Sequence, residues 1–420
     1  MREHLAITSL IASLGTISNA AIASDWKYGA EVSVETRYFP NEPLNEGQFS
    51  DFQPSLVLQP EARWESDNRK HQLVLVPFFR LDGQDDERTH FDLREAFYRF
   101  KSDQDWSLTV GAAKIFWGRT ESRHLVDIIN QTDSIEDIDE EDKLGQPMIN
   151  LTVSKEWGAL DFFVMSGFRD RSFPGFPGRL RFGLTIDTDD PIFERDDRRA
   201  AIDLAGRYSH FIGNWDFGLS IFHGTSREAR FAVDETQGRL LPVYDLITQG
   251  SIDFQYTQGA WLWKVEALAR SGHGEVFLAS VAGFEYTLYQ FAGTNFDLGL
   301  LAEYQYDGRD EGLVIEELVT ANGSAETLAV LAAPVTPADN DVFLGARLAL
   351  NDTQSSAILV GGTIDSADQS IGMFVEAERR FGQNWTASLE ARLFVNVDRD
   401  NILNAFRDDD FLNLRVTRYF

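Results

Sequence analysis

Residues 295–307 read NFDLGLLAEYQYD, and apolar and polar side chains alternate along most of this stretch. One parity carries Phe296, Leu298, Leu300, Ala302, Tyr304 and Tyr306. The other carries Asp297, Glu303, Gln305 and Asp307. A period of two indicates a β-strand with one apolar and one polar face. A strand of about ten residues or more is long enough to cross a bilayer when tilted, whereas soluble strands are about half that length.

The same alternation recurs in residues 27–39, 260–270, 384–397 and 411–420. Such repetition of long two-faced strands predicts an all-β chain that closes into an antiparallel transmembrane β-barrel. The spacing of the segments predicts about 18 strands, with 16 as the alternative.

The connections between these segments alternate between short polar turns and connections that are often much longer. Short turns include 66–70 and 257–260, whereas long connections include 119–145, 169–198 and 308–340. In outer-membrane barrels short turns face the periplasm and long loops face outward. Aromatic residues collect beside the short turns and predict an interfacial girdle. They are Tyr28, Trp64, Tyr98, Tyr208, Trp215, Tyr256, Trp261, Phe296, Trp385 and Phe420.

Composition excludes several classes of function. The formal charge of −29, from 67 acidic and 38 basic residues, argues against nucleic acid as a partner, because a phosphate-binding surface is basic. The chain has no Cys and therefore no disulfide or thiolate metal site. It contains no phosphate loop, metalloprotease motif or nucleophile motif, so we expect neither an enzyme nor a cofactor or metal.

Residues 1–23 have the organisation of a secretory signal peptide. Arg2 supplies the positive charge, 5–14 the apolar region, and Ala21-Ile-Ala23 the small-residue cleavage site. We therefore expect one mature domain, the barrel of residues 24–420.

The segment 411–420, FLNLRVTRYF, alternates in the same way and ends on Phe. It resembles the C-terminal assembly signal of Gram-negative outer-membrane β-barrels at Leu412, Leu414, Val416 and Phe420, and departs from it at Arg418. The resemblance implies an outer-membrane location. It also implies outer-membrane lipid, lipopolysaccharide and the barrel-assembly machinery as partners, and leaves monomer and homotrimer open.

A second stretch, Gly111 to Gly118 with Trp117, resembles the GxxxxxWG motif of large porin-like and alginate-exporter-type barrels. The family's Arg-Gln after the first glycine is absent, and Asn-Gln replaces its Asn-Pro. Within 119–145, Leu125, Ile128 and Ile129 have helical spacing and predict a short helix. Two interpretations remain open: an inward segment that constricts the lumen, or an ordinary external loop. The candidate constriction residues are His124, Asp127, Asn130, Asp133, Asp137 and Asp139.

The polar strand face carries both signs of charge, which cannot face lipid at about 2–4 kcal/mol per charged residue near the midplane. The candidates for the lumen lining are Glu31, Glu35, Arg37, Glu61, Arg63, Lys264, Glu266, Arg270, Glu303, Arg347, Glu390 and Arg392. They form either a selectivity lining or salt bridges that brace the wall.

These observations predict a porin-type channel for passive diffusion of small hydrophilic solutes. The alternatives are a dedicated exporter or importer of one substrate class, such as an acidic saccharide, an outer-membrane lipase or protease, and an adhesin with a closed lumen.

Overall fold

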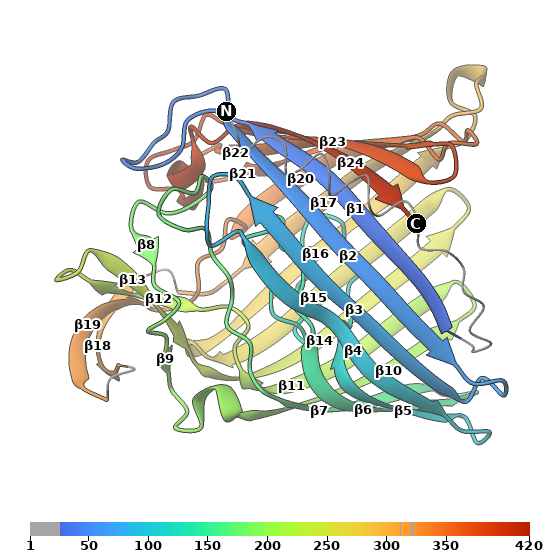
Figure 1. Ribbon diagram of the computed structural model, residues 1–420, viewed down its shortest axis with the longest axis horizontal. Helices are drawn as coiled ribbons and strands as arrows, with labels where there is room; N and C mark the ends of the chain where they lie inside the picture. Colours follow the sequence, from blue (N-terminus) through green and yellow to red (C-terminus); the bar gives the residue numbers. More distant parts are fainter. Residues whose placement is uncertain (1–25, 311, 321–322) are drawn as a thin grey trace, which may run out of the picture.

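A computed structural model of the chain describes residues 26–310, 312–320 and 323–420. An 18-stranded antiparallel sheet forms the body of the molecule and closes on itself (Figure 1), which confirms the predicted fold class and the larger of the two strand numbers. The expected signal peptide, residues 1–23, lies outside the described residues.

The barrel strands follow one another around the ring in chain order, and β1 pairs with β24 to close it, with Val34 opposite Val416. The barrel strands are β1 (Trp26–Tyr38), β2 (Phe52–Glu65), β3 (His71–Asp82), β4 (His90–Lys101), β5 (Trp106–Ala113), β6 (Gln146–Lys155), β7 (Gly158–Ser166), β10 (Ile202–Ile212), β11 (Trp215–Thr225), β14 (Leu246–Gln258), β15 (Trp261–Gly272), β16 (Gly274–Leu288), β17 (Asp297–Asp307), β20 (Asn340–Ala349), β21 (Ala357–Asp365), β22 (Ile371–Phe381), β23 (Trp385–Val395) and β24 (Phe411–Tyr419).

A second sheet of six short strands is built from the long connections and lies at one end of the barrel, on the left in Figure 1. Its strands are β8 (Thr185–Ile186), β9 (Ile192–Phe193), β12 (Arg230–Asp234), β13 (Arg239–Tyr244), β18 (Leu313–Val319) and β19 (Ala325–Leu331). Three short 3-10 helices complete the described elements: η1 (Arg198–Ala200), η2 (Phe291–Gly293) and η3 (Ile402–Phe406). No helix in the described ranges is long and apolar enough to cross a membrane.

The predicted alternation of short and long connections is correct for most of the ring but not for all of it. At the end that carries the small sheet, three connections are short: residues 83–89, His273 and residues 366–370. The single-residue turn at His273 depends on its neighbours Gly272 and Gly274, whose φ angles are +115° and +67°. Glycine adopts these angles without the steric penalty of other residues, so the chain reverses at once.

The two faces of the strands divide as the alternation predicts. Outward side chains such as Ile221 and Leu278 are 58% and 62% exposed, because nothing in the protein covers them. Inward carboxylates such as Glu35 and Glu266 are 0% exposed, although they face the hollow of the barrel. The outer surface therefore suits lipid, and something inside the barrel must cover the inner one.

Aromatic rings lie at both rims of the outer surface. Beside the short turns, ring centroids are 4.3 Å apart in the pair Trp215 and Tyr256. At the opposite rim the rings of Phe79 and Phe91 are 4.9 Å apart. Two such belts match the two interfaces of a membrane, where amphipathic rings prefer to lie.

The last strand presents its apolar side chains outward. Leu412, Leu414, Val416 and Phe420 are all exposed on this face, so their placement is compatible with an assembly signal, which stays a prediction. The guanidinium of Arg418, on the same face, lies 4.5 Å from the ring centroid of Phe420 and 5.4 Å from that of Trp385. The aromatic rim thus accommodates the one charge that departs from the apolar pattern.

An arginine placed on the outward or the inward face of β23 is expected to affect the stability of the barrel differently. Leu389, near the middle of this strand, is outward and 38% exposed, whereas Ser388 faces the lumen opposite Glu378 and Arg415. We expect Leu389→Arg to destabilise the inserted barrel by about 2–4 kcal/mol, because the guanidinium would enter lipid. Ser388→Arg should be tolerated. Urea unfolding in lipid vesicles measures both variants, and equal stabilities would contradict the assigned faces.

Candidate functional site in the barrel lumen

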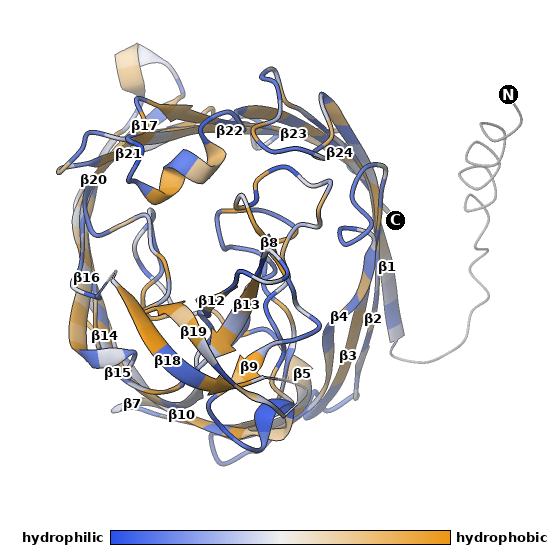
Figure 2. Cartoon of the chain, turned by 90° about the vertical axis from the view of Figure 1, so that its left-hand side faces the viewer, coloured by the Kyte–Doolittle hydropathy of each residue, from blue (hydrophilic) through white to orange (hydrophobic). Residues whose placement is uncertain are grey.

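Residues 114–145, which connect β5 to β6, lie inside the barrel rather than outside it, because they contact inward side chains of β1, β3, β15 and β17. Figure 2 shows connecting segments within the ring of strands. The segment contains turns and bends but no helix, so the predicted short helix is wrong. The physical reason is that the backbone amides of 119–122 and of Val126 donate hydrogen bonds to side chains of the barrel wall instead of to carbonyls one helical turn away.

Glu266 of β15 is the first of these wall side chains. Its Oε1 accepts hydrogen bonds from the backbone nitrogens of Arg119 at 2.5 Å and Thr120 at 3.0 Å, and from the Thr120 hydroxyl at 2.9 Å. Its Oε2 accepts from the Val126 nitrogen at 3.2 Å. A buried carboxylate is therefore satisfied entirely by the segment that it holds.

Glu303 of β17 holds the adjacent residues in the same way. Its Oε1 accepts from the Glu121 nitrogen at 2.8 Å, and its Oε2 from the Ser122 nitrogen at 2.8 Å and the Ser122 hydroxyl at 2.6 Å. Arg123 extends this contact through a 3.0 Å ion pair with Asp307. The sequence predicted Glu266 and Glu303 as lumen residues but gave no sign that their partners are backbone amides.

Apolar packing fixes the middle of the segment against β7. Trp117, Val126, Ile128 and Ile129 are buried in one cluster that also contains Phe163 and Met165 of β7. The rings of Trp117 and Phe163 meet edge to face with centroids 5.6 Å apart. Leu125, Ile128 and Ile129, whose spacing predicted a helix, are buried, but they pack against the barrel wall.

Asn130 and Asp127 stabilise the fold of the segment itself. The Asn130 amide accepts from the Ile115 nitrogen and donates to the carbonyls of Ala113 and Leu144, so it joins the two ends of the segment. Asp127 accepts from the Trp117 nitrogen at 3.2 Å. Burial raises the pKa of Asp127, and Lys143, 3.5 Å away, opposes that rise.

The remaining candidate of this group, His124, lies beside Phe116, with ring centroids 4.9 Å apart. It also lines the central cavity of the lumen described below.

The acidic second half of the segment binds the opposite wall. Asp133 pairs with Arg94 at 2.7 Å, Glu136 with Arg80 at 2.7 Å, and Asp137 with Arg37 at 2.5 Å. These arginines belong to β4, β3 and β1, which lie roughly half-way round the ring from β15 and β17. The segment therefore crosses the lumen and is held on both sides. Bidentate pairing of a guanidinium with a carboxylate fixes geometry as well as charge.

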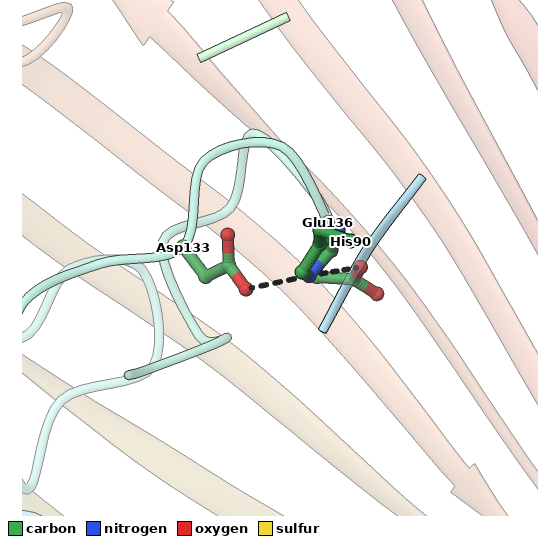
Figure 3. Close-up of side chains that lie close together, drawn as sticks. All are labelled: His90, Asp133 and Glu136. Atoms are coloured by element: carbon green, nitrogen blue, oxygen red, sulfur yellow. Dashed lines mark ion pairs between the residues drawn. The ribbon is translucent and has the colours of Figure 1, made fainter. Parts of the chain in front are cut away.

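Figure 3 shows His90, Asp133 and Glu136 at this contact, with the histidine between the two carboxylates. The His90 Nε2 is 3.6 Å from an oxygen of each. Burial opposes ionisation of Asp133, but the His90 ring and the Arg94 guanidinium outweigh it and lower the pKa of Asp133. The three side chains have the composition of a metal site. Because arginines already occupy both carboxylates, we assign them to anchoring.

Glu35 of β1 is the centre of the arginine cluster on this wall. Arg80 and Arg88 approach its Oε1 at 3.1 and 2.9 Å, and Arg415 donates to its Oε2 at 2.8 Å. Arg88 also pairs with Asp82 at 2.9 Å. Sequence reasoning predicted Glu35 and Arg37 but did not select Arg94, although it lies on the inward face of β4 and is buried.

The other predicted lumen residues are mostly ion-paired. Lys264 and Arg347 approach Glu121 at 3.8 and 2.5 Å, and Arg392 pairs with Glu390 at 2.7 Å and with Asp139 at 3.0 Å. Arg270 pairs with Glu228, Arg63 pairs with Glu61, and Glu31 is half-buried.

A cavity of about 450 Å³ lies between the 114–145 segment and the wall formed by β20, β21 and β22. A series of rings borders it, in which each member lies near the next: Phe173, Phe231, Phe182, Phe406 and Phe394. Successive centroids are 5.7, 5.7, 5.8 and 6.1 Å apart. These rings come from four separate connections and strands. No single stretch of sequence carries a signal that they meet.

No protein-family model and no curated protein matches the sequence. Solved structures do match the fold. Pseudomonas aeruginosa OccK11 (OpdR) aligns with a TM-score of 0.52 and 9% identity over 94% of this chain and 96% of that chain. A BenF-like porin from Pseudomonas fluorescens Pf-5 aligns with a TM-score of 0.51 and 10% identity over 94% and 98%.

A third match is Wzi of Escherichia coli, described as a carbohydrate-binding β-barrel involved in group 1 capsule assembly. It aligns with a TM-score of 0.50 and 9% identity over 99% of this chain and 87% of that chain. At these identities the similarity concerns the fold. The chain has the fold of these porins, a closed antiparallel β-barrel.

The two-sided attachment predicts how the segment responds when one wall releases it. In the double variant Glu266→Gln/Glu303→Gln, each side-chain amide oxygen accepts weaker hydrogen bonds than the carboxylate that it replaces. We expect backbone amides of 119–126 to exchange hydrogen at least about tenfold faster, since each charged hydrogen bond contributes about 1.5–3 kcal/mol. Hydrogen-exchange mass spectrometry measures this.

The matched control is Glu285→Gln, because Glu285 faces the lumen from β16 without a hydrogen bond to this segment. Unchanged exchange in the double variant would show that the packing at Trp117 and the contacts with the wall arginines hold the segment without these two carboxylates.

Proposed function

We propose that the protein is a porin-type channel through which small hydrophilic solutes diffuse, with the 114–145 segment as its constriction. The observation that carries the proposal is the attachment of this segment to two opposite walls, by Glu266 and Glu303 on one side and by Arg37, Arg80 and Arg94 on the other. A segment fixed in this way narrows the lumen permanently and sets a size limit for solutes.

The interior chemistry supports passage of polar solutes. The inward faces carry carboxylates, guanidiniums and amides, whereas the outward faces are apolar. The cavity of about 450 Å³ beside the segment falls within the ~300–1,000 Å³ range of small-molecule sites. A lumen of this kind offers water and small polar molecules a path that lipid does not.

The enzyme alternative finds less support. Among the described residues, the side-chain hydroxyls that hydrogen-bond to a histidine ring belong to Tyr98, at His71, and Thr248, at His223. Both pairs lie on exposed strand surfaces. Neither provides the serine and oriented base of a hydrolase.

A binding barrel with a closed lumen is the second candidate. The six-stranded sheet over one mouth and the many ion pairs within the lumen favour it. Wzi, a carbohydrate-binding barrel by its description, shows that this fold also serves binding. Ion conductance separates the two candidates.

We expect the purified protein to form ion-conducting pores in planar bilayers. Glu266→Gln/Glu303→Gln should raise the single-channel conductance or add larger sublevels, because the constriction is released on one side. Glu285→Gln should leave the conductance unchanged. A protein that conducts neither as the parent nor after replacement of residues 119–143 by a short Gly-Ser linker would contradict the channel and favour the closed barrel.

A weak cation preference is expected for this channel. Of the loop carboxylates, Glu136 and Asp137 are already paired with arginines, but Glu141 has no Lys or Arg within 4.0 Å among the described residues and is exposed at the cavity. Unpaired anionic groups raise the local concentration of cations over about 8–10 Å at physiological ionic strength. Reversal potentials across a KCl gradient measure this, and Glu141→Gln should reduce the preference, most clearly at low salt. Anion preference in the parent would show that the basic wall residues dominate.

A further inference from the structure

The side of the cavity that faces the 114–145 segment carries two parallel rings on the barrel wall. Phe343 of β20 and Phe374 of β22 stack with centroids 6.1 Å apart and planes inclined by 10°. Both line the cavity. They lie across Gly361 of β21, and a Cβ at that position would be 2.7 Å from the Phe343 ring and 2.8 Å from the Phe374 ring. The glycine therefore gives the rings room to lie against the wall.

Two carboxylates lie next to these rings at the end of the same strands. Asp341 of β20 and Asp365 of β21 are cross-strand partners, 1% and 7% exposed, and both line the cavity. Backbone nitrogens of Asn340 and Ala367 and the side-chain amide of Asn401 donate to them. Across the described ranges, no Lys or Arg nitrogen lies within 4.0 Å of either carboxylate.

The basic side chains of the cavity differ in this respect, because their charges are already compensated. Six of them form ion pairs with carboxylates: Arg123, Lys143, Arg171, Arg227, Arg270 and Arg392. Arg181 donates to backbone carbonyls, including those of Phe176 and Phe182. The charge that a solute can still neutralise at this wall is therefore negative. A buried charge without an opposite charge nearby is costly, so a cationic solute would be favoured.

We propose that the cavity binds a compact organic cation, namely an amine or ammonium group on an apolar, preferably aromatic, body. The ammonium group lies against Asp341 and Asp365, and the body packs on Phe343 and Phe374. Ammonium groups interact favourably with both carboxylates and ring faces. The Arg392 guanidinium, 5.1 Å from the Phe374 centroid, already places a cation on this one of the two rings. This inference rests on the proposed channel and specifies the class of solute that its lumen takes.

A divalent metal ion is the competing occupant. The carboxylates of Asp339, Asp341 and Asp365 approach one another within 4.8 Å, which fits oxygen ligation. An acidic cluster alone does not identify a metal site, and a metal ion gives no role to the stacked rings. The experiment below therefore includes Ca²⁺ as an outcome that would overturn the proposal.

Isothermal titration calorimetry of the whole protein in detergent, stripped of divalent metal ions with EDTA and then dialysed into EDTA-free buffer, tests the proposal with three organic probes of similar size and, in a separate titration, with Ca²⁺. We expect benzylammonium to bind, and benzyl alcohol and benzoate to bind at least about tenfold more weakly, because only the first supplies a positive charge. Asp341→Asn/Asp365→Asn should weaken benzylammonium binding at least about tenfold. Phe343→Leu should weaken it while both carboxylates remain.

Two further variants keep the test informative. Asp196→Asn/Asp400→Asn makes the same change of charge on exposed loop residues and should bind benzylammonium like the parent. Thr363→Lys keeps both carboxylates but places an ammonium group of the protein beside them, since Thr363 lines the cavity opposite Phe343. It should abolish binding even if the double asparagine variant fails to fold.

Equal binding of all three probes, or no loss of binding in Thr363→Lys, would overturn the proposal. Binding of Ca²⁺ without binding of benzylammonium would overturn it as well. Because calorimetry requires no conductance, its outcome is independent of the channel itself. A barrel that binds benzylammonium but does not conduct would contradict the channel alone, and one that conducts without binding would contradict this inference alone.

Discussion

Hydrogen bonds from backbone amides to two buried carboxylates, Glu266 and Glu303, determine how the interior of this barrel is arranged. Burying an amide or a carboxylate without a hydrogen-bond partner is strongly unfavourable, and here each provides the partner of the other. Without these contacts, residues 119–126 would need another set of acceptors, such as those of a helix or of water outside the barrel. The position of the whole 114–145 segment in the lumen follows from this pairing.

The arginines of β1, β3 and β4 provide a complementary attachment of opposite polarity. On one wall, fixed negative charges receive donors from the segment. On the other, fixed positive charges receive its carboxylates at Asp133, Glu136 and Asp137. The segment therefore has a preferred orientation, because exchanging its two halves would place its carboxylates against Glu266 and Glu303. Electrostatic complementarity of this kind contributes more to specificity of arrangement than to net stability.

The fold was predictable because the decisive signal is local. Period-two alternation over long stretches, as in 295–307, depends only on neighbours in sequence, and one face must meet lipid. The three short connections at the end that carries the small sheet were missed because turn length is set by the few residues at each hairpin, as at Gly272 and Gly274. The candidate site was predictable only in part. The inward carboxylates were recognisable by parity, but their amide partners lie far away in sequence.

The incorrect helix prediction for Leu125, Ile128 and Ile129 has the same cause, because contacts with residues distant in sequence decide the conformation. Helical spacing describes which side chains share a face only if the backbone bonds to itself, and here the wall supplies better acceptors. The stacked rings of Phe343 and Phe374 depend similarly on the absence of a side chain at Gly361, on the strand between them. Such an arrangement needs residues from three strands, so the sequence pattern of any one strand does not predict it.

Closure of the ring by β1 and β24 has a consequence for the order of folding. The paired residues Val34 and Val416 are nearly the whole described chain apart, so this contact has a large loop-closure cost and needs almost every other strand to be in place. The wall cluster around Glu35 includes Arg415 of β24 and is complete only when β24 has joined β1. One wall that holds the lumen segment is thus assembled from strands at both ends of the described chain. The 114–145 segment can therefore make all its wall contacts only after β1 and β24 have paired and the barrel is closed.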